Sequence, residues 1–144
     1  MTQISGKRFV QPEDVETLAF DWGRLQWLSE PKVTGADKFV LGVVTVEPGK
    51  GHLRHNHPDM EEILYVIEGE GTQMVDIGGE QRRRVVAGDL IHLPAGVFHE
   101  TVNTGDKTLR FLVVFGPTGQ EEILRAMPDC KIEPAIRHGA DVSK

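Results

Sequence analysis

The stretch His55-Asn56-His57-Pro58-Asp59-Met60-Glu61-Glu62 places two histidines one residue apart, a proline turn after them, and two adjacent glutamates at its end. A further histidine, His99, follows much later in the chain. Imidazole nitrogens and carboxylate oxygens are ligands that divalent first-row metals take in proteins. The pattern therefore predicts a metal site, provided that the fold brings these side chains together.

Length and composition limit the classes of protein to which the chain can belong. Its 144 residues, 39% of them hydrophobic and 6% aromatic, suit one domain with one core. The formal charge of -6 argues against nucleic acid and against an anionic membrane as partners. The N-terminus lacks the apolar run of a signal peptide, no stretch is apolar enough to span a membrane, and the single Cys130 excludes an internal disulfide. We therefore expect a cytoplasmic protein.

Short apolar or alternating runs fill the middle of the chain and are separated by Gly, Pro, Asn and Asp, which is typical of an all-β barrel or sandwich. Gly78 and Gly79 supply the positive φ of a tight hairpin turn between two of these runs. The expected strands cover residues 39–46, 63–68, 72–77, 81–86, 90–93, 98–102 and 109–115. This organisation predicts one all-β domain, with the barrel over residues 37–117.

Residues 1–36 differ from the barrel and are interpreted as an N-terminal arm. Within this arm, residues 12–18 are expected to form a helical turn, and residues 21–28 alternate as a strand does. Such an arm either closes an edge of the barrel or crosses to a neighbouring subunit.

Residues 118–144 are interpreted as a C-terminal segment and tail. A short helix is expected over residues 120–127, and Pro128 and Pro134 are expected to prevent any regular element after it. The last dozen residues, which include His138, are interpreted as a solvated tail.

Strand alternation gives a first test of the metal site. Residues two apart in a strand point to the same face, so His55 and His57 are expected to point into the barrel together. A new strand that begins near Glu62 then turns Glu61 outward. The inward set of that strand is expected to be Glu62, Leu64, Val66 and Glu68, and the outward set Ile63, Tyr65 and Ile67.

Two longer patterns contain these residues: Gly49-x5-His55-x-His57-x4-Glu62-x6-Gly69 and Gly88-x5-Pro94-x-Gly96-x2-His99-x3-Asn103. They resemble both signature motifs of the cupin superfamily, with every signature position present, and the short spacer between them is similar to that of single-domain bacterial cupins. The resemblance implies a jelly-roll β-barrel with one divalent metal ion near its centre. The ligands that it implies are His55, His57, Glu62 and His99. The metal is Fe, Mn, Ni, Co, Cu or Zn, since this ligand set does not select among them.

Several side chains outside these ligands remain as candidates. His92, within residues 90–93, is either a catalytic acid or base that reaches the cavity or a structural imidazole on the outer face. The run Arg82-Arg83-Arg84 alternates faces, so it either points one guanidinium inward, toward a substrate carboxylate, or lies at a solvated edge. His52 also lies outside the motifs. Candidates for the cavity lining, the core or a subunit contact are Trp22, Trp27, Tyr65, Gln73, Met74 and Phe111.

Three functions are compatible with such a site. With a redox-active metal, an enol, catechol or flavonol-like substrate would react with O₂, as in the quercetin and cysteamine-type dioxygenases among similar cupins, and we take this as the leading hypothesis. The metal would otherwise act as a Lewis acid in an isomerase, epimerase or lyase of a sugar or sugar acid. Glu62 is the expected proton acceptor in either reaction. The third function is a non-catalytic module that binds or senses a small molecule.

The outward residues of the strand that begins near Glu62 predict an assembly. Ile63, Tyr65 and Ile67 are apolar, and a sheet face of this kind is usually covered. A homodimer with twofold symmetry is the simplest way to cover it.

Overall fold

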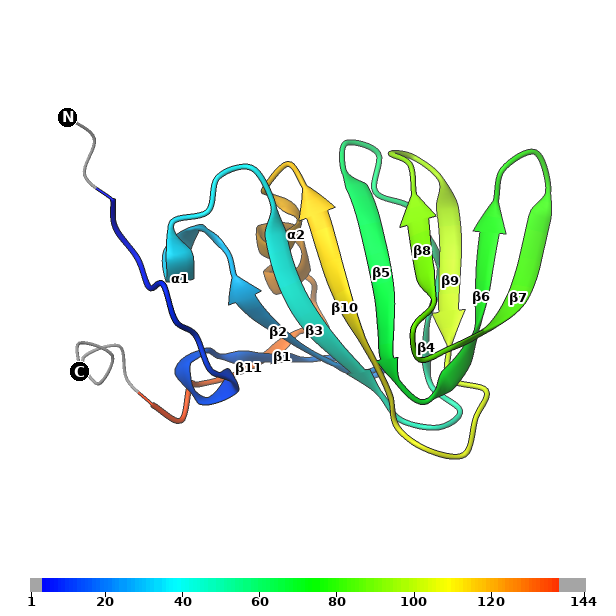
Figure 1. Cartoon of the computed structure of the whole chain (residues 1–144), viewed down its shortest axis with the longest axis horizontal. Helices are drawn as coiled ribbons and strands as arrows, with labels where there is room; N and C mark the ends of the chain where they lie inside the picture. Colours follow the sequence, from blue (N-terminus) through cyan, green and yellow to red (C-terminus); the bar gives the residue numbers. More distant parts are fainter. Residues whose placement is uncertain (1–3, 138–144) are drawn as a thin grey trace.

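Two antiparallel sheets face each other in the part of the chain that the structure describes, residues 4–137 (Figure 1). In this computed structural model, the larger sheet has seven strands within those residues, in the order β11 (Lys131–Glu133), β1 (Thr17–Ala19), β2 (Arg24–Ser29), β3 (Val40–Val46), β10 (Leu109–Gly116), β5 (Glu61–Glu68) and β8 (Leu90–Leu93). The smaller sheet has the order β4 (Gly51–His55), β9 (Phe98–Val102), β6 (Glu70–Asp76) and β7 (Glu80–Val86). The all-β fold expected from the sequence is confirmed.

The central strands follow the alternation of the sequence. Each expected strand of the barrel appears with its ends within two residues of the predicted bounds. Strands β3 and β10 alternate between buried and half-buried positions along their whole length, and β5 buries Glu62, Leu64 and Val66 while Glu61 points outward. Apolar side chains from the facing sides of the sheets form the core, which includes Leu25, Trp27, Val44, Leu64, Phe111 and Val113.

Glu68 departs from the expected inward set because the pairing of β5 with β10 is irregular. Arg110 lies opposite Glu68, whereas Phe111, the next residue of β10, lies opposite Val66. This bulge adds one residue to β5 and turns Glu68 to the outer face. There its carboxylate lies 3.6 Å from the guanidinium of Arg110, so the prediction of an inward Glu68 was wrong.

Segments from both ends of the described chain build one edge of the larger sheet. The helical turn expected over residues 12–18 is limited to a 3₁₀ turn at Pro12–Asp14, and β1 follows it. A short helix, α1 (Pro31–Thr34), joins β2 to β3. Strand β11 lies between Pro128 and Pro134 and pairs antiparallel with β1. The prediction that these prolines prevent regular structure was wrong, because a proline beyond a strand's end leaves its ladder of hydrogen bonds intact.

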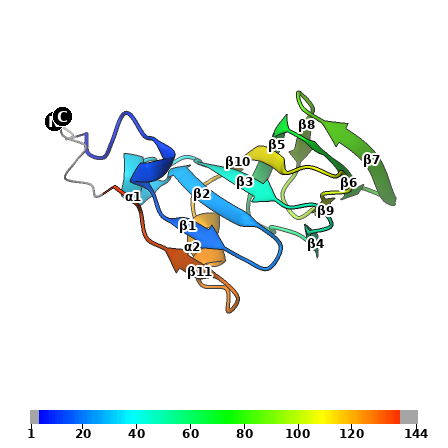
Figure 2. The ribbon, with the colours of Figure 1, turned by 90° about the horizontal axis from the view of Figure 1, so that it is seen from below.

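The helix expected after the barrel is present as α2 (Gln120–Arg125), two residues shorter than predicted. It lies on the same side of the larger sheet as β4 and β9 (Figure 2). The guanidinium of Arg125 donates hydrogen bonds to Glu30 at 2.5 and 2.7 Å and to Glu16 at 2.7 Å. This buried ion cluster fixes α2 to the N-terminal segments. Neither α2 nor another helix of residues 4–137 is long and apolar enough to cross a membrane.

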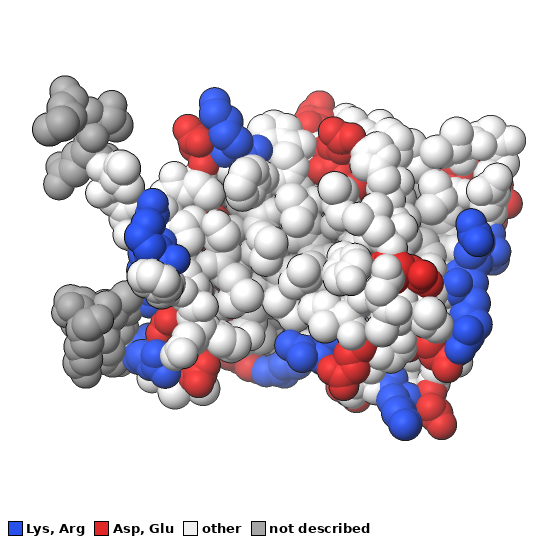
Figure 3. Space-filling view, viewed as in Figure 1, with Lys and Arg blue, Asp and Glu red and all other residues white. Residues whose placement is uncertain are grey.

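The outer face of the larger sheet is poor in charged groups. Figure 3 shows a broad uncharged area over β3, β10 and β5, with Lys, Arg, Asp and Glu gathered mostly at its rim. Ile63, Tyr65 and Ile67 lie on this face with exposed fractions of 36%, 42% and 41%. Their outward orientation agrees with the alternation of the sequence, and the homodimer stays a prediction.

Candidate metal site

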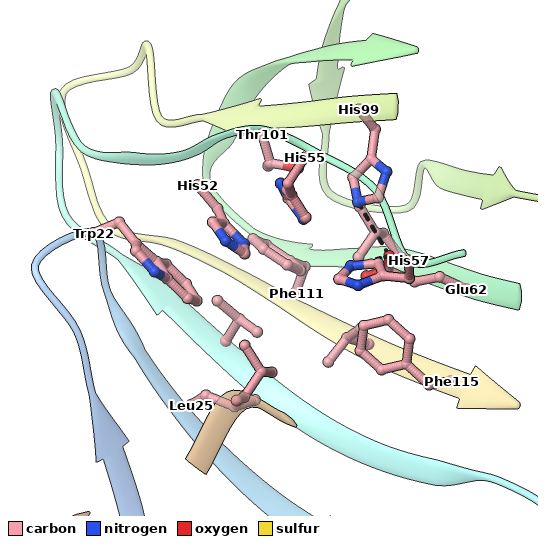
Figure 4. A pocket seen from close by; sticks show the side chains of 14 residues that line it. Trp22, Leu25, His52, His55, His57, Glu62, His99, Thr101, Phe111 and Phe115 are labelled. Atoms are coloured by element: carbon pink, nitrogen blue, oxygen red, sulfur yellow. Dashed lines mark ion pairs between the residues drawn. The ribbon is translucent and has the colours of Figure 1, made fainter. Parts of the chain in front are cut away.

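Three histidines converge between the two sheets (Figure 4). His55 is the last residue of β4 and lies opposite His99 of β9 in the strand register. His57 follows two residues after His55. One ligand nitrogen from each histidine can be chosen so that all three lie within 4.8 Å of one another. The fold therefore brings together the three histidines predicted from the sequence, in a group that could hold a metal ion.

His57 reaches this cluster by a different route from the one predicted. Strand β4 ends at His55, so His57 lies in the following loop and does not share a strand with it. The carbonyl oxygen of His57 accepts hydrogen bonds from the backbone N–H groups of Met60, at 3.3 Å, and Gly96, at 3.0 Å. The side-chain amide of Asn56 donates to the carbonyl of Gly96 at 3.1 Å. Contact between two loops, and not strand alternation, positions His57.

Backbone carbonyls fix the tautomers of two rings. The Nδ1 atom of His55 lies 2.6 Å from the carbonyl oxygen of Leu53, and that of His99 lies 2.9 Å from the carbonyl oxygen of Val97. A carbonyl oxygen only accepts hydrogen bonds, so both Nδ1 atoms carry the proton. Each Nε2 atom then keeps its lone pair, which is the arrangement found in histidines that bind metals.

Glu62 completes the cluster from the other sheet. Its Oε1 atom lies 3.2 Å from Nε2 of His99 and 3.5 Å from Nε2 of His57, and its side chain is buried. Both Oε1 of Glu62 and Nε2 of His99 are buried atoms without a hydrogen-bond partner. Two unpartnered acceptors that face each other at 3.2 Å repel, whereas a cation between them would satisfy both. The residues therefore fit a divalent metal ion, and their role as ligands stays a prediction.

Burial changes the pKa values of the side chains in this cluster. Removal from water, together with the neighbouring histidines, lowers the pKa of His55 to about 4 and that of His57 to about 3. These rings are therefore neutral near pH 7, as a metal ligand must be. Burial raises the pKa of the Glu62 carboxyl, and the contact with His99 opposes that shift.

His52 is a further histidine of the cavity, and the motifs do not include it. Its ring stacks on His55, with centroids 3.7 Å apart, and on Trp22 at 4.3 Å. In a regular strand, residues three apart point to opposite faces. Here His52 pairs with Thr101 and His55 pairs with His99, so three steps along β4 correspond to two steps along β9. The extra residue in β4 places both histidines on one face. A bulge leaves no signal in the alternation, so the sequence alone could not find His52.

The histidines and Glu62 line an inner cavity with about 40 Å³ of free space. The rest of its wall is largely apolar, with side chains from both sheets and from α2, among them Leu25, Val44, Leu64, Phe111, Val113, Phe115 and Leu124. An open outer cleft of about 550 Å³ adjoins it, and Phe20, Lys50, Met127 and Asp129 contribute to its wall. Of the aromatic candidates, Trp22 and Phe111 therefore line the inner cavity, whereas Trp27 is part of the core.

The other polar candidates lie away from the inner cavity. His92 is opposite Ile63 in the pairing of β8 with β5, and its ring contacts Glu61 on the outer face. All three arginines of the run Arg82-Arg83-Arg84 are exposed on β7, an edge strand. Arg83 lies opposite the buried Gln73 and, with Arg84 and His92, lines a separate pocket, so a role for this run in binding a substrate carboxylate stays a prediction. His138 lies outside the described residues.

Comparison with known protein families assigns the fold. A family model described as a cupin domain matches residues 42–115, about half of the chain. The chain belongs to the cupin family. This match confirms that the two sequence motifs of this cupin are those of the cupin superfamily.

Curated relatives match most of this cupin. "Polyketide synthase CurC" of Streptomyces cyaneus is 30% identical over 110 residues, which are 76% of this chain and 70% of that protein. "Protein SchB" of Streptomyces halstedii is 32% identical over 110 residues, covering 76% of this chain and 78% of that protein. Among solved structures, oxalate decarboxylase of Bacillus subtilis, described with Mn(II) centres, matches with a TM-score of 0.63 and 25% identity. That match covers 76% of this cupin and 31% of the decarboxylase chain.

Proposed function

We propose that this cupin is a metal-dependent enzyme of the dioxygenase type that acts on an enol, catechol or flavonol-like substrate. The proposal rests on one observation, the buried group of His55, His57, His99 and Glu62 with its unpartnered acceptor atoms. A metal site in a largely apolar cavity, next to an open cleft, suits an enzyme better than a purely structural role.

A divalent ion held by the three histidines and Glu62 would supply Lewis acidity and, with a redox-active metal, the electrons that O₂ chemistry requires. The carbonyls of Leu53 and Val97 hold two of the rings in the tautomer that leaves Nε2 free. The Glu62 carboxylate is the group placed to accept the proton of an enol, because its Oε1 atom is buried beside His57 and His99 without a hydrogen-bond partner. The apolar wall keeps bulk water from the resulting enolate.

The lining of the cavity supports an enolic substrate over a sugar. The part of a substrate that enters the inner cavity lies against Leu25, Val44, Leu64 and Phe111, where each sugar hydroxyl would lose hydrogen bonds to water. CurC is described as a polyketide synthase, and polyketides carry closely spaced carbonyl groups that enolise readily. The Mn(II) centres described for oxalate decarboxylase support a divalent metal. The sugar isomerase, epimerase or lyase comes second, and the binding or sensing role third.

Oxygen consumption tests the proposal. Metal-free protein is loaded in turn with Fe(II), Mn(II), Ni(II), Co(II), Cu(II) or Zn(II) and mixed with a β-diketone, a catechol or a flavonol while dissolved O₂ is recorded. We expect uptake of O₂ with at least one redox-active metal, incorporation of labelled oxygen into the product, and no uptake with Zn(II) or with His57→Ala. His92→Asn changes a histidine on the outer face and should keep the rate. Loss of the rate in that variant would support the catalytic role considered for His92.

Metal-loaded protein that leaves O₂ unchanged with every substrate would contradict the dioxygenase proposal. Exchange of deuterium from D₂O into an aldose or uronate would then favour the isomerase. Binding of a substrate without any turnover would favour the sensor.

A further inference from the structure

The inner cavity and the outer cleft meet at a threshold formed by Trp22, His52 and Leu124. These three side chains, together with His55, line both spaces. Trp22 lies on the turn between β1 and β2, His52 lies on β4, and Leu124 lies on α2. A molecule that moves from the outer cleft to the metal-site residues passes these side chains, and Figure 4 shows Trp22 and His52 at one side of the cluster.

The two spaces differ strongly in size. The inner cavity has about 40 Å³ of free space, and the outer cleft has about 550 Å³. The inner cavity thus offers less than a tenth of the space of the outer cleft, enough for a few water-sized groups. The outer cleft therefore has room for a ring-sized molecule, and the inner cavity has far less.

One side of the threshold is a continuous stack of four rings. Phe20 stacks on Trp22 with centroids 4.9 Å apart and planes inclined by 12°. Trp22 stacks on His52 at 4.3 Å and 5°, and His52 stacks on His55 at 3.7 Å and 24°. The stack thus runs from the wall of the outer cleft to a histidine of the metal site. Each ring restricts the rotation of the next, so this side of the threshold is rigid.

The other side of the threshold is Leu124, whose side chain is buried. The next residue, Arg125, donates hydrogen bonds to Glu16 and to both carboxylate oxygens of Glu30. Because this cluster fixes α2 to the N-terminal segments, Leu124 cannot move away without breaking buried ion pairs.

We propose that Trp22, His52 and Leu124 determine substrate specificity by admitting only a narrow head group to the inner cavity, while the body of the substrate stays in the outer cleft. The proposal rests on the proposed function, since the head group is the part that reaches the metal site. The ligand class is a molecule with a ring-sized, largely apolar body that ends in an unbranched enol or enolate oxygen. Trp22 and Leu124 lie outside residues 42–115, the part of the chain that matches the family model. Other cupins can therefore carry different residues at the threshold and select other substrates with the same metal site.

Chemical modification of the metal-free protein tests the threshold without any metal. Diethyl pyrocarbonate reacts with neutral imidazole, and peptide mass spectrometry gives the rate at each histidine. His99 is 3% exposed and should react far more slowly than His92, whose side chain is 47% exposed and serves as the internal reference. We expect Trp22→Ala and Leu124→Ala to accelerate the reaction of His99 about tenfold, since a few methyl-sized groups at a tight passage have effects of that order.

Matched variants separate the threshold from general loosening of the fold. Ile123→Ala removes the neighbouring side chain of α2, which is 50% exposed, and Trp27→Phe changes a tryptophan of the core. Both should react at His99 as the wild type does. Thermal unfolding verifies that each variant is folded, and Leu124→Val replaces Leu124→Ala if the latter is not.

Anion binding to Co(II)-loaded protein, followed by visible absorption, gives a second readout. Formate and pivalate carry the same carboxylate head but differ in width directly behind it. The wild type should bind formate at least about tenfold more tightly than pivalate, and Trp22→Ala or Leu124→Ala should remove most of this preference. His52→Phe, which keeps the stack, should preserve it.

The outcomes distinguish the threshold from the proposed function. Unchanged modification of His99 in the folded variants, or equal affinities of the wild type for formate and pivalate, would overturn the threshold. Failure to bind Co(II), together with faster modification of His99 in the variants, would refute the proposed function and leave the threshold in place.

Discussion

His55 and His99 are direct partners across β4 and β9, and their ring centroids lie 4.3 Å apart. Pairing of neighbouring strands fixes the relative height of opposite residues, so the backbone itself places these two rings. Glu62 reaches the same point from the other sheet, and His57 reaches it from a loop. The complete group therefore exists only when the two sheets are packed on each other.

Removal of one histidine should abolish metal binding and leave the barrel folded. We expect His57→Ala to weaken metal affinity by about 100-fold or more. Mutation of a residue that only hydrogen-bonds to a metal ligand already costs up to that much, and loss of a ligand itself should cost at least the same. The melting temperature of the metal-free protein should change little, since the apolar core between the sheets holds the fold. Elemental analysis after dialysis and calorimetric titration measure the affinity, with His92→Ala as the control. An unfolded His57→Ala protein would show that the metal site is structural.

Glu62→Gln should stabilise the metal-free protein while it weakens metal binding. Burial raises the pKa of the Glu62 carboxyl above its ordinary 4.5, so the charged form favours the unfolded chain near neutral pH. The neutral amide avoids this cost, and we expect the free energy of unfolding by urea to increase. The gain should vanish below pH 4.5, where the unfolded chain also binds the proton. Glu61→Gln, on the outer face, should give no gain, and a less stable Glu62→Gln would contradict the argument.

Acidification should destabilise the metal-free protein through its buried histidines. Burial lowers the pKa of His52 and His57 to about 3 and that of His55 to about 4, from 6.5. Between pH 6.5 and about pH 4 the unfolded chain therefore binds more protons than the folded protein, and the free energy of unfolding falls with pH. Thermal unfolding across this range measures the slope. His52→Phe should flatten it and His92→Asn should not, so equal slopes for His52→Phe and the wild type would disprove the assignment.

The Arg125–Glu30 pair should contribute more to stability than an exposed ion pair. Glu30 is only 2% exposed, so Arg125→Gln leaves a buried carboxylate without its partner. We expect a loss of about 3 kcal/mol in guanidinium chloride denaturation. Arg84→Gln, which breaks an exposed contact with Glu70, is the matched control and should have little effect. Equally small losses in both variants would show that water replaces Arg125 at Glu30.

A second copy of the chain should cover the outer face of the larger sheet. Ile63, Tyr65 and Ile67 form an exposed apolar row on β5, and Leu90 of β8 is 58% exposed beside it. Light scattering after size exclusion should give the mass of a dimer for the wild type. Tyr65→Glu should give a monomer, because an interface of this kind cannot solvate the added charge. Ile77→Glu, at the hairpin turn, is the control that should stay dimeric, and a monomeric wild type would refute the prediction.

The alternation of apolar and polar residues correctly predicted the strands, and the direction of their side chains, wherever neighbouring strands pair regularly. It placed the barrel strands and turned Glu62 inward and Glu61 outward, because one face of β5 is buried and the other is exposed. It was wrong at Glu68 and gave no indication that His52 lines the cavity, since each lies next to a bulge that adds a residue to one strand. A bulge depends on the partner strand and has no local pattern that the sequence displays.

Two further features depend on contacts between distant segments. His57 points into the cavity because its loop is hydrogen-bonded to the loop that contains Gly96. Strand β11 has three residues and exists through its pairing with β1, so local propensity gave no sign of it. The metal-site histidines could be predicted because their spacing is a motif, whereas the shape of the entrance arises from the ends of the chain.

The pairing of β1 with β11 joins an early and a late segment of the chain. The histidines of the metal site and Glu62 are all synthesised before residues 120–133, which supply Leu124, Arg125 and the outermost strand of the larger sheet. A chain without residues 120–133 would lack Leu124, and with it one side of the entrance to the inner cavity. The same late segment therefore completes the edge of the larger sheet and narrows the path to His55, His57, His99 and Glu62, so both features form in one folding step.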